Sequence, residues 1–189
     1  ATKLIAMTYF LEPDVITFAN TFLLDIFSQI NGCKLSISII HDINTMNQLD
    51  MVLKKDKKKK IVSYTIGRRK TYDLEHIRFI RKKYPKLKLK LMVNEGCVFD
   101  CPDQNFHSSS LTMSKGVISH PERIFYCGKL PSDQDWRFLS GQYIPPKFLV
   151  NYDGIIDEFK IGSRNFSSTD MAQVLEEYIK GKDITIYRA

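Results

Sequence analysis

Reactive side chains crowd the segment NEGCVFDCPDQNFH, which runs from Asn94 to His107. Cys97 and Cys101 stand in a C-x3-C arrangement, a spacing at which a loop after a strand can bring two thiolates to one metal. Cys127 ends the next strand-like stretch, RIFYC, so the fold could place a third thiolate alongside. Because cysteine sulfur holds iron–sulfur clusters, these three residues predict one. His107 would be the fourth ligand, or one iron would keep an open position.

Two other interpretations of the same residues remain open. Zinc competes with iron, because three cysteines and one histidine are a standard structural zinc set. Ordinary cytosolic thiols without a metal are the third interpretation. The chain lacks the further C-x2-C of radical S-adenosylmethionine enzymes. Cys33 precedes its strand, so we expect it at the opposite rim of the sheet, as a small buried apolar residue.

Polar, charged or sulfur-bearing residues follow nearly every expected strand, where the sites of parallel α/β proteins form. They are Thr8-Tyr9, His41-Asp42, Arg68-Arg69, Asn94 to Cys97, Cys127, and Lys160 to Arg164. We expect Glu95, His41 and Lys160 to be catalytic. Substrate binding is expected of Arg68, Asn94 and Arg164. The cationic members of this set favour an anionic substrate.

Strand-like and helix-like stretches alternate along the chain. Strands are expected at 3–10, 34–40, 60–66, 88–93, 123–127, 138–144, 157–164 and 184–188, and helices at 15–30, 45–55, 71–84, after Pro145-Pro146, and at 167–181. Such alternation predicts a parallel sheet with helical crossovers, either an open doubly wound sheet or a barrel. No G-x-G-x-x-G or P-loop follows a strand, so we favour a TIM-like (β/α) barrel, compact or incomplete at its N-terminal side.

Length and composition predict one globular domain over residues 1–189, because the chain is 43% apolar and 12% aromatic. No apolar run approaches the length of a membrane span, and no signal-peptide layout opens the chain, so we expect a cytoplasmic protein with reduced cysteines. The net charge of +7 is concentrated in Lys54–Lys60 and Arg78–Lys90. A basic excess can attract nucleic acid or another polyanion, but like-charge blocks are more often solvated helix ends and turns.

Two segments of the chain resemble the collagenase-like peptidase family, which is family 32 of the peptidases of unknown mechanism. In DEFKIGSRNFSSTDMAQVLEEYIKG, the residues Phe159, Lys160, Ile161 and Arg164 match a late strand that reads roughly F-K-I-E-G-R in the family. Gly162 and Ser163 stand where the family has Glu-Gly, so the acidic residue is missing. The cysteine-bearing loop and the segment SGQYIPPKFLVNYDGI are similar to the family as well. The resemblance covers roughly residues 60 to 181.

The resemblance implies a (β/α) barrel with four cysteines on one 4Fe–4S cluster, in a family whose members include proteins of oxygen-independent hydroxylation that act in ubiquinone synthesis and on RNA. Our leading hypothesis is therefore an iron–sulfur protein that modifies an anionic substrate, either RNA or a small molecule. The second hypothesis is a zinc-dependent hydrolase or peptidase of the same fold with Glu95 as the base. The third is a non-catalytic barrel with a structural metal that docks on a protein partner.

Overall fold

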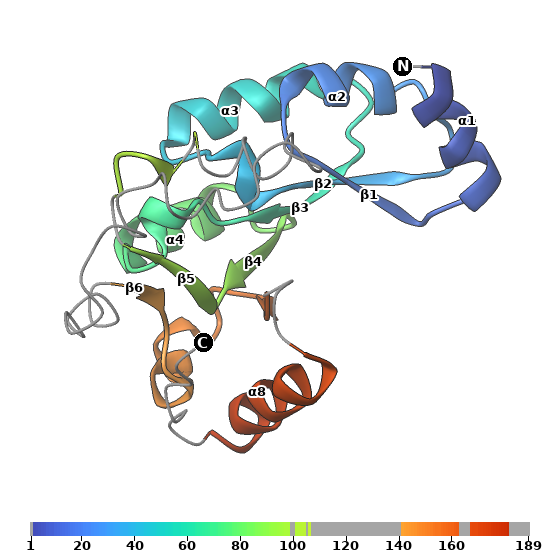
Figure 1. Ribbon diagram of the computed structural model, residues 1–189. Coiled ribbons are helices and arrows are strands. Elements are labelled where there is room, and N and C mark those ends of the chain that lie inside the picture. The colour runs from blue at the N-terminus through green and yellow to red at the C-terminus, as the bar shows by residue number, and fades with distance from the viewer. Residues whose placement is uncertain (1, 99–100, 105, 107–140, 163–166, 182–189) are drawn as a thin grey trace. The chain divides into compact units, whose positions relative to one another are not determined.

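The computed structural model describes residues 2–98, 101–104, 106, 141–162 and 167–181 (Figure 1). These residues form two compact units. Unit 1 comprises Ala1–Leu91 and Ile155–Glu158, and unit 2 comprises Met92–Gly154 and Phe159–Ala189. The expectation of a single domain over the whole chain stays a prediction. Within the described ranges, no helix combines the length and the apolar character that crossing a membrane requires.

The N-terminal elements correct two of our expectations. Residues 3–10 form helix α1 (Thr2–Leu11), not a strand, so Thr8 and Tyr9 do not follow a strand. The stretch 15–30 is not one helix, because strand β1 (Val15–Phe18) precedes helix α2 (Thr21–Phe27). Asn20 separates them by accepting a hydrogen bond from the Leu23 amide, which starts the helix there. A short apolar run has no periodicity that distinguishes strand from helix, which is why both expectations failed.

The rest of unit 1 follows the expected alternation. Strand β2 (Lys34–Ile37) leads through the short helix η1 (Ile39–His41) to α3 (Met46–Lys55), and β3 (Ile61–Thr65) leads through η2 (Arg68–Lys70) to α4 (Leu74–Lys83) and β4 (Lys88–Met92). Thr45 caps α3, and its partner Gln48 completes a capping box. Neighbouring strands from β1 to β4 pair in parallel.

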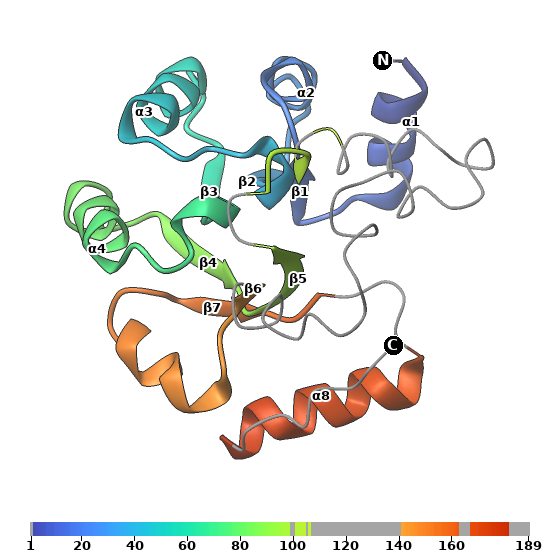
Figure 2. The same ribbon diagram turned by 60° about the vertical axis from the view of Figure 1, so that its left-hand side comes forward.

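The strand order is evidence for a barrel-like winding. The five-stranded parallel sheet has the order β1-β2-β3-β4-β7, where β7 is Glu158–Lys160. Its first four strands stand in chain order, and right-handed crossovers then place every connecting helix on the same face. Figure 2 shows α2, α3 and α4 on one face of these strands. A doubly wound sheet reverses its strand order and carries helices on both faces, so the described strands favour the singly wound arrangement of (β/α) barrels.

The core of unit 1 lies between this sheet and its helices. Most of it comes from residues in or directly after the strands, and Leu35, Ile37, Tyr64, Ile66, Leu89 and Leu91 are each at most 1% exposed. The helices add Leu24, Leu49, Val52, Ile77 and Ile80, which are each at most 4% exposed. Burial of side chains of this size stabilises the fold by about 1.5–3 kcal/mol each. Cys33 is 5% exposed, which confirms the expectation that it is buried.

Unit 2 contains the cysteine-bearing segment, and here the structure corrects a third expectation. Residues Asn94–Val98 form strand β5, which pairs antiparallel with β6 (Gly141–Tyr143), rather than a loop after β4. The short helix η4 (Pro146–Tyr152) begins after Pro145, as the proline pair predicted. Helix α8 (Ser168–Lys180) begins at its Ser167 cap and ends at Gly181, whose φ of 64° suits glycine.

Candidate functional site

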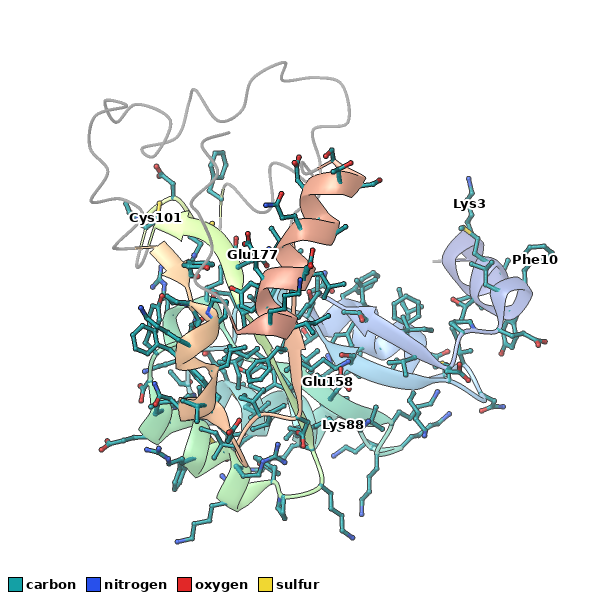
Figure 3. The ribbon with its side chains drawn as sticks, turned by 90° about the horizontal axis from the view of Figure 1, so that it is seen from below. Lys3, Phe10, Lys88, Cys101, Glu158 and Glu177 are labelled. Carbon is teal, nitrogen blue, oxygen red and sulfur yellow. The ribbon has the colours of Figure 1, made fainter. Side chains whose placement is uncertain are left out.

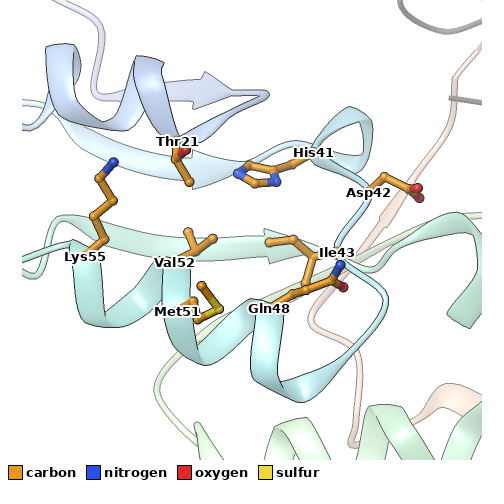
Figure 4. A pocket seen from close by; sticks show the side chains of 8 residues that line it. All are labelled: Thr21, His41, Asp42, Ile43, Gln48, Met51, Val52 and Lys55. Carbon is orange, nitrogen blue, oxygen red and sulfur yellow. The ribbon is translucent and has the colours of Figure 1, made fainter. Parts of the chain in front are cut away.

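A pocket of about 390 Å³ opens in unit 1 at the carboxyl ends of β1 and β2 (Figure 4). Thr21 is the first residue of α2, and His41 ends the short helix after β2, so both side chains reach the pocket from segments that follow a strand. Met51, Val52 and Lys55 of α3 form the opposite wall. The carboxyl end of a parallel sheet is where binding sites form in this class of fold, so this pocket is a candidate ligand site.

The imidazole of His41 is held by packing and not by hydrogen bonds. Its ring meets the edge of Phe18 with the two centroids 5.9 Å apart and an angle of 81° between the ring planes. Its Nε2 atom is buried without a hydrogen-bond partner, and so is one carboxylate oxygen of Asp42. In Figure 4 the His41 ring lies on the same side of the pocket as Thr21, whereas the Asp42 carboxylate points away. His41 therefore borders the pocket with one ring nitrogen unpaired, and its acid–base role stays a prediction.

Tyr64 fixes the segment that follows His41. This side chain is 1% exposed, donates a hydrogen bond to the Ile43 carbonyl at 2.8 Å and accepts one from the Gly67 amide at 3.2 Å. Burial raises the pKa of Tyr64 well above its usual value, so the hydroxyl stays protonated and keeps donating. A Cβ atom at Gly67 would lie 2.2 Å from the Ile43 carbonyl oxygen, so only glycine allows this approach.

Arg68, which we expected to bind substrate, is only 8% exposed at the start of η2. The backbone therefore places this residue after β3 as predicted, but most of its side chain is covered by protein. A buried guanidinium needs paired hydrogen bonds to offset its lost hydration, so part of its bonding capacity is used within the fold. Its role in substrate binding stays a prediction.

The two described cysteines of unit 2 differ in exposure. Cys97 lies on β5 and is half-buried, whereas Cys101 is 8% exposed and follows that strand. The Gln104 amide donates a hydrogen bond to the Cys101 carbonyl at 3.2 Å, which folds residues 101–104 into a turn. This turn brings the Gln104 backbone back to the buried cysteine.

Two buried glutamines near these cysteines have no hydrogen-bond partner for either side-chain amide atom. Gln104 is 2% exposed and Gln142 is 0% exposed. Gln142 lies on β6, between the residues that pair with Asn94 and Val98, and therefore opposite the part of β5 that carries Cys97. Sequence reasoning missed both glutamines. Their sequence signal was an amide inside the strand expected at 138–144, and an amide three residues after a cysteine.

The remaining predicted residues of unit 2 have separate surroundings. The Asn94 side chain donates to the Gly162 carbonyl and accepts from the Gly162 amide at 2.6 Å, so its amide joins the segment after β7 to β5. Glu95 is half-buried on β5, and Lys160 is exposed at the end of β7. These contacts give Asn94 a structural role, and its expected contact with a substrate stays a prediction.

Tyr178 anchors α8 within unit 2. Its hydroxyl lies 2.9 Å from the Val93 carbonyl oxygen and 2.9 Å from the Ile144 carbonyl oxygen, and the side chain is 9% exposed. The backbone between these two carbonyls is itself paired, because the Ile144 amide donates to Val93 at 2.8 Å. Tyr178 lies within the segment DEFKIGSRNFSSTDMAQVLEEYIKG, on which the family resemblance partly rests.

The other predicted ligands, Cys127 and His107, lie outside the described residues, and so does Arg164. Within the part of the chain that the structure describes, no group of three or more histidine, cysteine, aspartate or glutamate side chains could hold a metal ion. The predicted convergence of Cys97, Cys101 and Cys127 is therefore untested.

Comparisons with known proteins give two relationships. The chain is 25% identical over 169 residues to the uncharacterized protease MJ1657 of Methanocaldococcus jannaschii, covering 88% of this chain and 49% of that protein. Its fold is similar to the structure of the U32 peptidase Mk0906, with a TM-score of 0.55 and 13% identity over 88% of this chain and 61% of that one. No family model matches the chain. The chain thus spans about half the length of the curated relative, and both comparisons agree with the resemblance to the U32 peptidases: one through distant sequence similarity to a protease, the other through the fold.

Proposed function

We propose that this chain forms part of a (β/α) barrel of the cytoplasm that holds an iron–sulfur cluster and modifies an anionic substrate, such as RNA or a small molecule, by a redox reaction. Cys97, Cys101 and Cys127 would bind the cluster, with His107 as the fourth ligand or with one iron open. The observation that carries the proposal is the pair of buried, unpartnered amides of Gln104 and Gln142 near the two described cysteines.

The surroundings of the two described cysteines support such a group. A buried amide without a partner costs about 1–3 kcal/mol for each polar group, and a native fold retains that cost only when a partner offsets it. Sulfur atoms of a bound cluster accept hydrogen bonds from neighbouring donors, which would satisfy the amide N–H groups. When bound, the cluster would supply one-electron chemistry.

The chain's own residues would then bind the substrate and move protons. Arg68, Asn94 and Arg164 would hold the anionic groups of the substrate. Glu95, His41 and Lys160 would exchange protons with it. For His41 the support is structural, because its buried Nε2 atom has no partner in the fold and it borders a pocket.

A zinc-dependent hydrolase is the second candidate, and the names of the two relatives, a protease and a peptidase, favour it. The same cysteines would hold zinc, and Glu95 would act as the base that activates water. Thiolates and carboxylates suit ions of different hardness, so Glu95 would face the substrate rather than the metal.

Metal and sulfide analysis of anaerobically purified protein tests the proposal and separates the two candidates. We expect a brown protein with iron and acid-labile sulfide, and loss of both in Cys97→Ala and in Cys101→Ala. Cys33→Ala is the matched control, because Cys33 is buried in unit 1 and should leave the metal in place. Colourless protein with zinc would favour the hydrolase, and metal-free protein would contradict both.

Limited proteolysis adds a readout that does not depend on colour. Thiolate coordination should stabilise the segment after Cys97, so removing the metal should increase cleavage between residues 98 and 114 while the rest of the fold resists. Identical digestion patterns before and after chelator treatment would show that no metal holds this segment.

A further inference from the structure

The fold brings the two lysine-rich segments of the sequence to one pocket, at the opposite end of the strands from His41. The pocket has a volume of about 440 Å³. Ile61, the first residue of β3, and Leu87, just before β4, place it at the amino ends of these strands. Lys59 comes from the first basic segment, whereas Lys83 and Lys86 come from the second. Nothing in the sequence indicated that these two segments meet.

Most of the lysines in these segments lack an acidic partner. Lys55 pairs with Asp25 at 2.7 Å, and Lys83 pairs with Asp50 at 2.5 Å. Among the described residues, six other lysines are exposed and form no ion pair: Lys54, Lys57, Lys58, Lys59, Lys82 and Lys86. Like charges gathered in one place repel each other, so a partner of opposite charge would be attracted to this end of the unit.

The pocket itself is mainly apolar. Its apolar walls come from Leu53, Ile61, Tyr84, Pro85 and Leu87. The Tyr84 hydroxyl donates to Asp50 at 2.5 Å, which ties this ring to α3 and fixes one side of the pocket. An apolar centre with a charged rim is the layout of protein-binding surfaces, in which one buried anchor side chain supplies most of the affinity.

Asp56 distinguishes between a protein and a nucleic acid as the occupant. It lines the pocket, is 5% exposed, and accepts a hydrogen bond from the Ile61 amide at 2.7 Å through one oxygen. Its other oxygen has no hydrogen-bond partner. That oxygen can accept a hydrogen bond from a peptide N–H, a donor that the sugar-phosphate backbone of a nucleic acid does not have. Nucleic-acid grooves also favour aromatic faces that are free to stack, and here the Lys83 ammonium lies over the Tyr84 ring, 5.6 Å from its centroid.

We propose that this pocket docks an acidic segment of a partner protein. An aliphatic or aromatic side chain of that segment occupies the apolar centre, and a backbone N–H near it donates to Asp56. Carboxylates on both sides of the anchor pair with the lysines of the rim, chiefly Lys59 and Lys86. This docking surface lies at the amino ends of the strands and is independent of any metal chemistry.

Titration with a synthetic peptide tests the proposal. The probe is a short peptide with one central leucine flanked on both sides by aspartates and glutamates. Its binding is followed through the amide chemical shifts of the isotopically labelled protein. We expect saturable shifts in residues 53–61 and 83–87, weakened by added salt because exposed charges are screened. Replacing the leucine of the peptide by alanine should weaken binding about fivefold, since the anchor is lost.

Charge reversal on the protein supplies the matched control. The double variant Lys59→Glu, Lys86→Glu should weaken peptide binding about tenfold or more, whereas Lys3→Glu on α1, which does not line the pocket, should leave it nearly unchanged. Unchanged melting temperatures would show that the variants are folded. The proposal is overturned if the peptide causes no shifts, or if polyuridylate binds this surface while the peptide does not. It is also overturned if Lys3→Glu weakens peptide binding as much as the double variant does.

Discussion

Gln142 is the residue whose surroundings are least explained by the fold alone. It is completely buried on β6, and neither atom of its amide has a partner. A leucine of similar volume would remove both unmet polar groups, so in a protein without a bound group it should be more stable. In a protein whose Gln142 amide binds a ligand, the same change should instead weaken the binding of that ligand.

We therefore predict opposite effects of Gln142→Leu on the two forms of the protein. In metal-free protein the free energy of unfolding should rise by about 1–2 kcal/mol. In anaerobically purified protein the same variant should lose metal faster to a chelator than the parent does. Urea unfolding and the rate of metal release measure the two effects. A variant that is destabilised without metal would show that the amide has a structural role that we have not identified.

Asn94 is a polar residue at a strand end whose side chain binds the backbone of another segment. Its type and position after β4 predicted a substrate contact, but both ends of its amide bind Gly162. Gly162 stands where the related family has glutamate. A Cβ atom there would lie 2.8 Å from the Met92 sulfur, which is a flexible neighbour. The loss of the acidic residue is thus accompanied by close packing between this backbone and Met92.

At the scale of elements, single tyrosines join segments that are distant in the sequence. Tyr64 of β3 holds the loop after β2 and the turn after its own strand through one hydroxyl. The Tyr178 hydroxyl of α8 lies 2.9 Å from both the Val93 and the Ile144 carbonyl oxygens, so its one hydrogen is shared between them. Because both hydroxyls are buried, losing either one leaves a buried carbonyl without its donor.

We predict that Tyr64→Phe lowers the free energy of unfolding by about 1–3 kcal/mol, because the Ile43 carbonyl then lacks a donor. The loop that carries His41 should also loosen, which faster amide exchange at residues 41–44 would reveal. Tyr9→Phe is the control, since Tyr9 is 56% exposed on α1 and should change stability by less than about 0.5 kcal/mol. Equal effects of the two variants would contradict the assigned role of Tyr64.

At the scale of the molecule, a few carboxylates set the response to acid. A hydrogen bond from Lys83, and then one from Tyr84, hold the pKa of Asp50 below its usual value. Lys70 and the His76 amide do the same for Asp73. Burial works to raise the pKa of Asp157, but the Leu89 amide and the Arg81 guanidinium outweigh it and leave that pKa lowered. Figure 3 shows Lys88 and Glu158 lying close together, and they form an ion pair at 3.8 Å.

We predict that the protein loses stability as the pH falls below about 4, the range of unperturbed aspartate pKa values. A carboxylate with a lowered folded-state pKa stabilises the fold above its unfolded pKa, and this contribution disappears as acid protonates the folded state. Urea midpoints at pH 7 and pH 3 measure the loss. Asp157→Asn should cost about 1 kcal/mol at pH 7 and much less at pH 3. If the variant loses the same free energy of unfolding at pH 7 and at pH 3, Asp157 is excluded as a source of the acid sensitivity.

The sequence by itself determined the elements that carry strong local signals. Thr45 and Ser167 cap helices, Gly181 ends one, and branched strands such as β3 stand where the residue pattern placed them. These outcomes follow from short-range chemistry, because a cap or a left-handed terminus involves only residues a few positions apart. The resemblance to the U32 peptidases could also be predicted from the sequence, since it rested on contiguous segments.

Only the tertiary structure decided what depends on residues distant in the chain. The apolar runs at 3–10 and 15–18 fit strand or helix equally well, and β5 became a strand because β6 supplies its partner from more than forty positions away. The same reason applies to three further features: the burial of Gln142, the hydrogen bonds between Asn94 and Gly162, and the pocket that Lys59 and Lys86 both line. Side-chain roles of this kind are set by packing and pairing between elements, which no local pattern records.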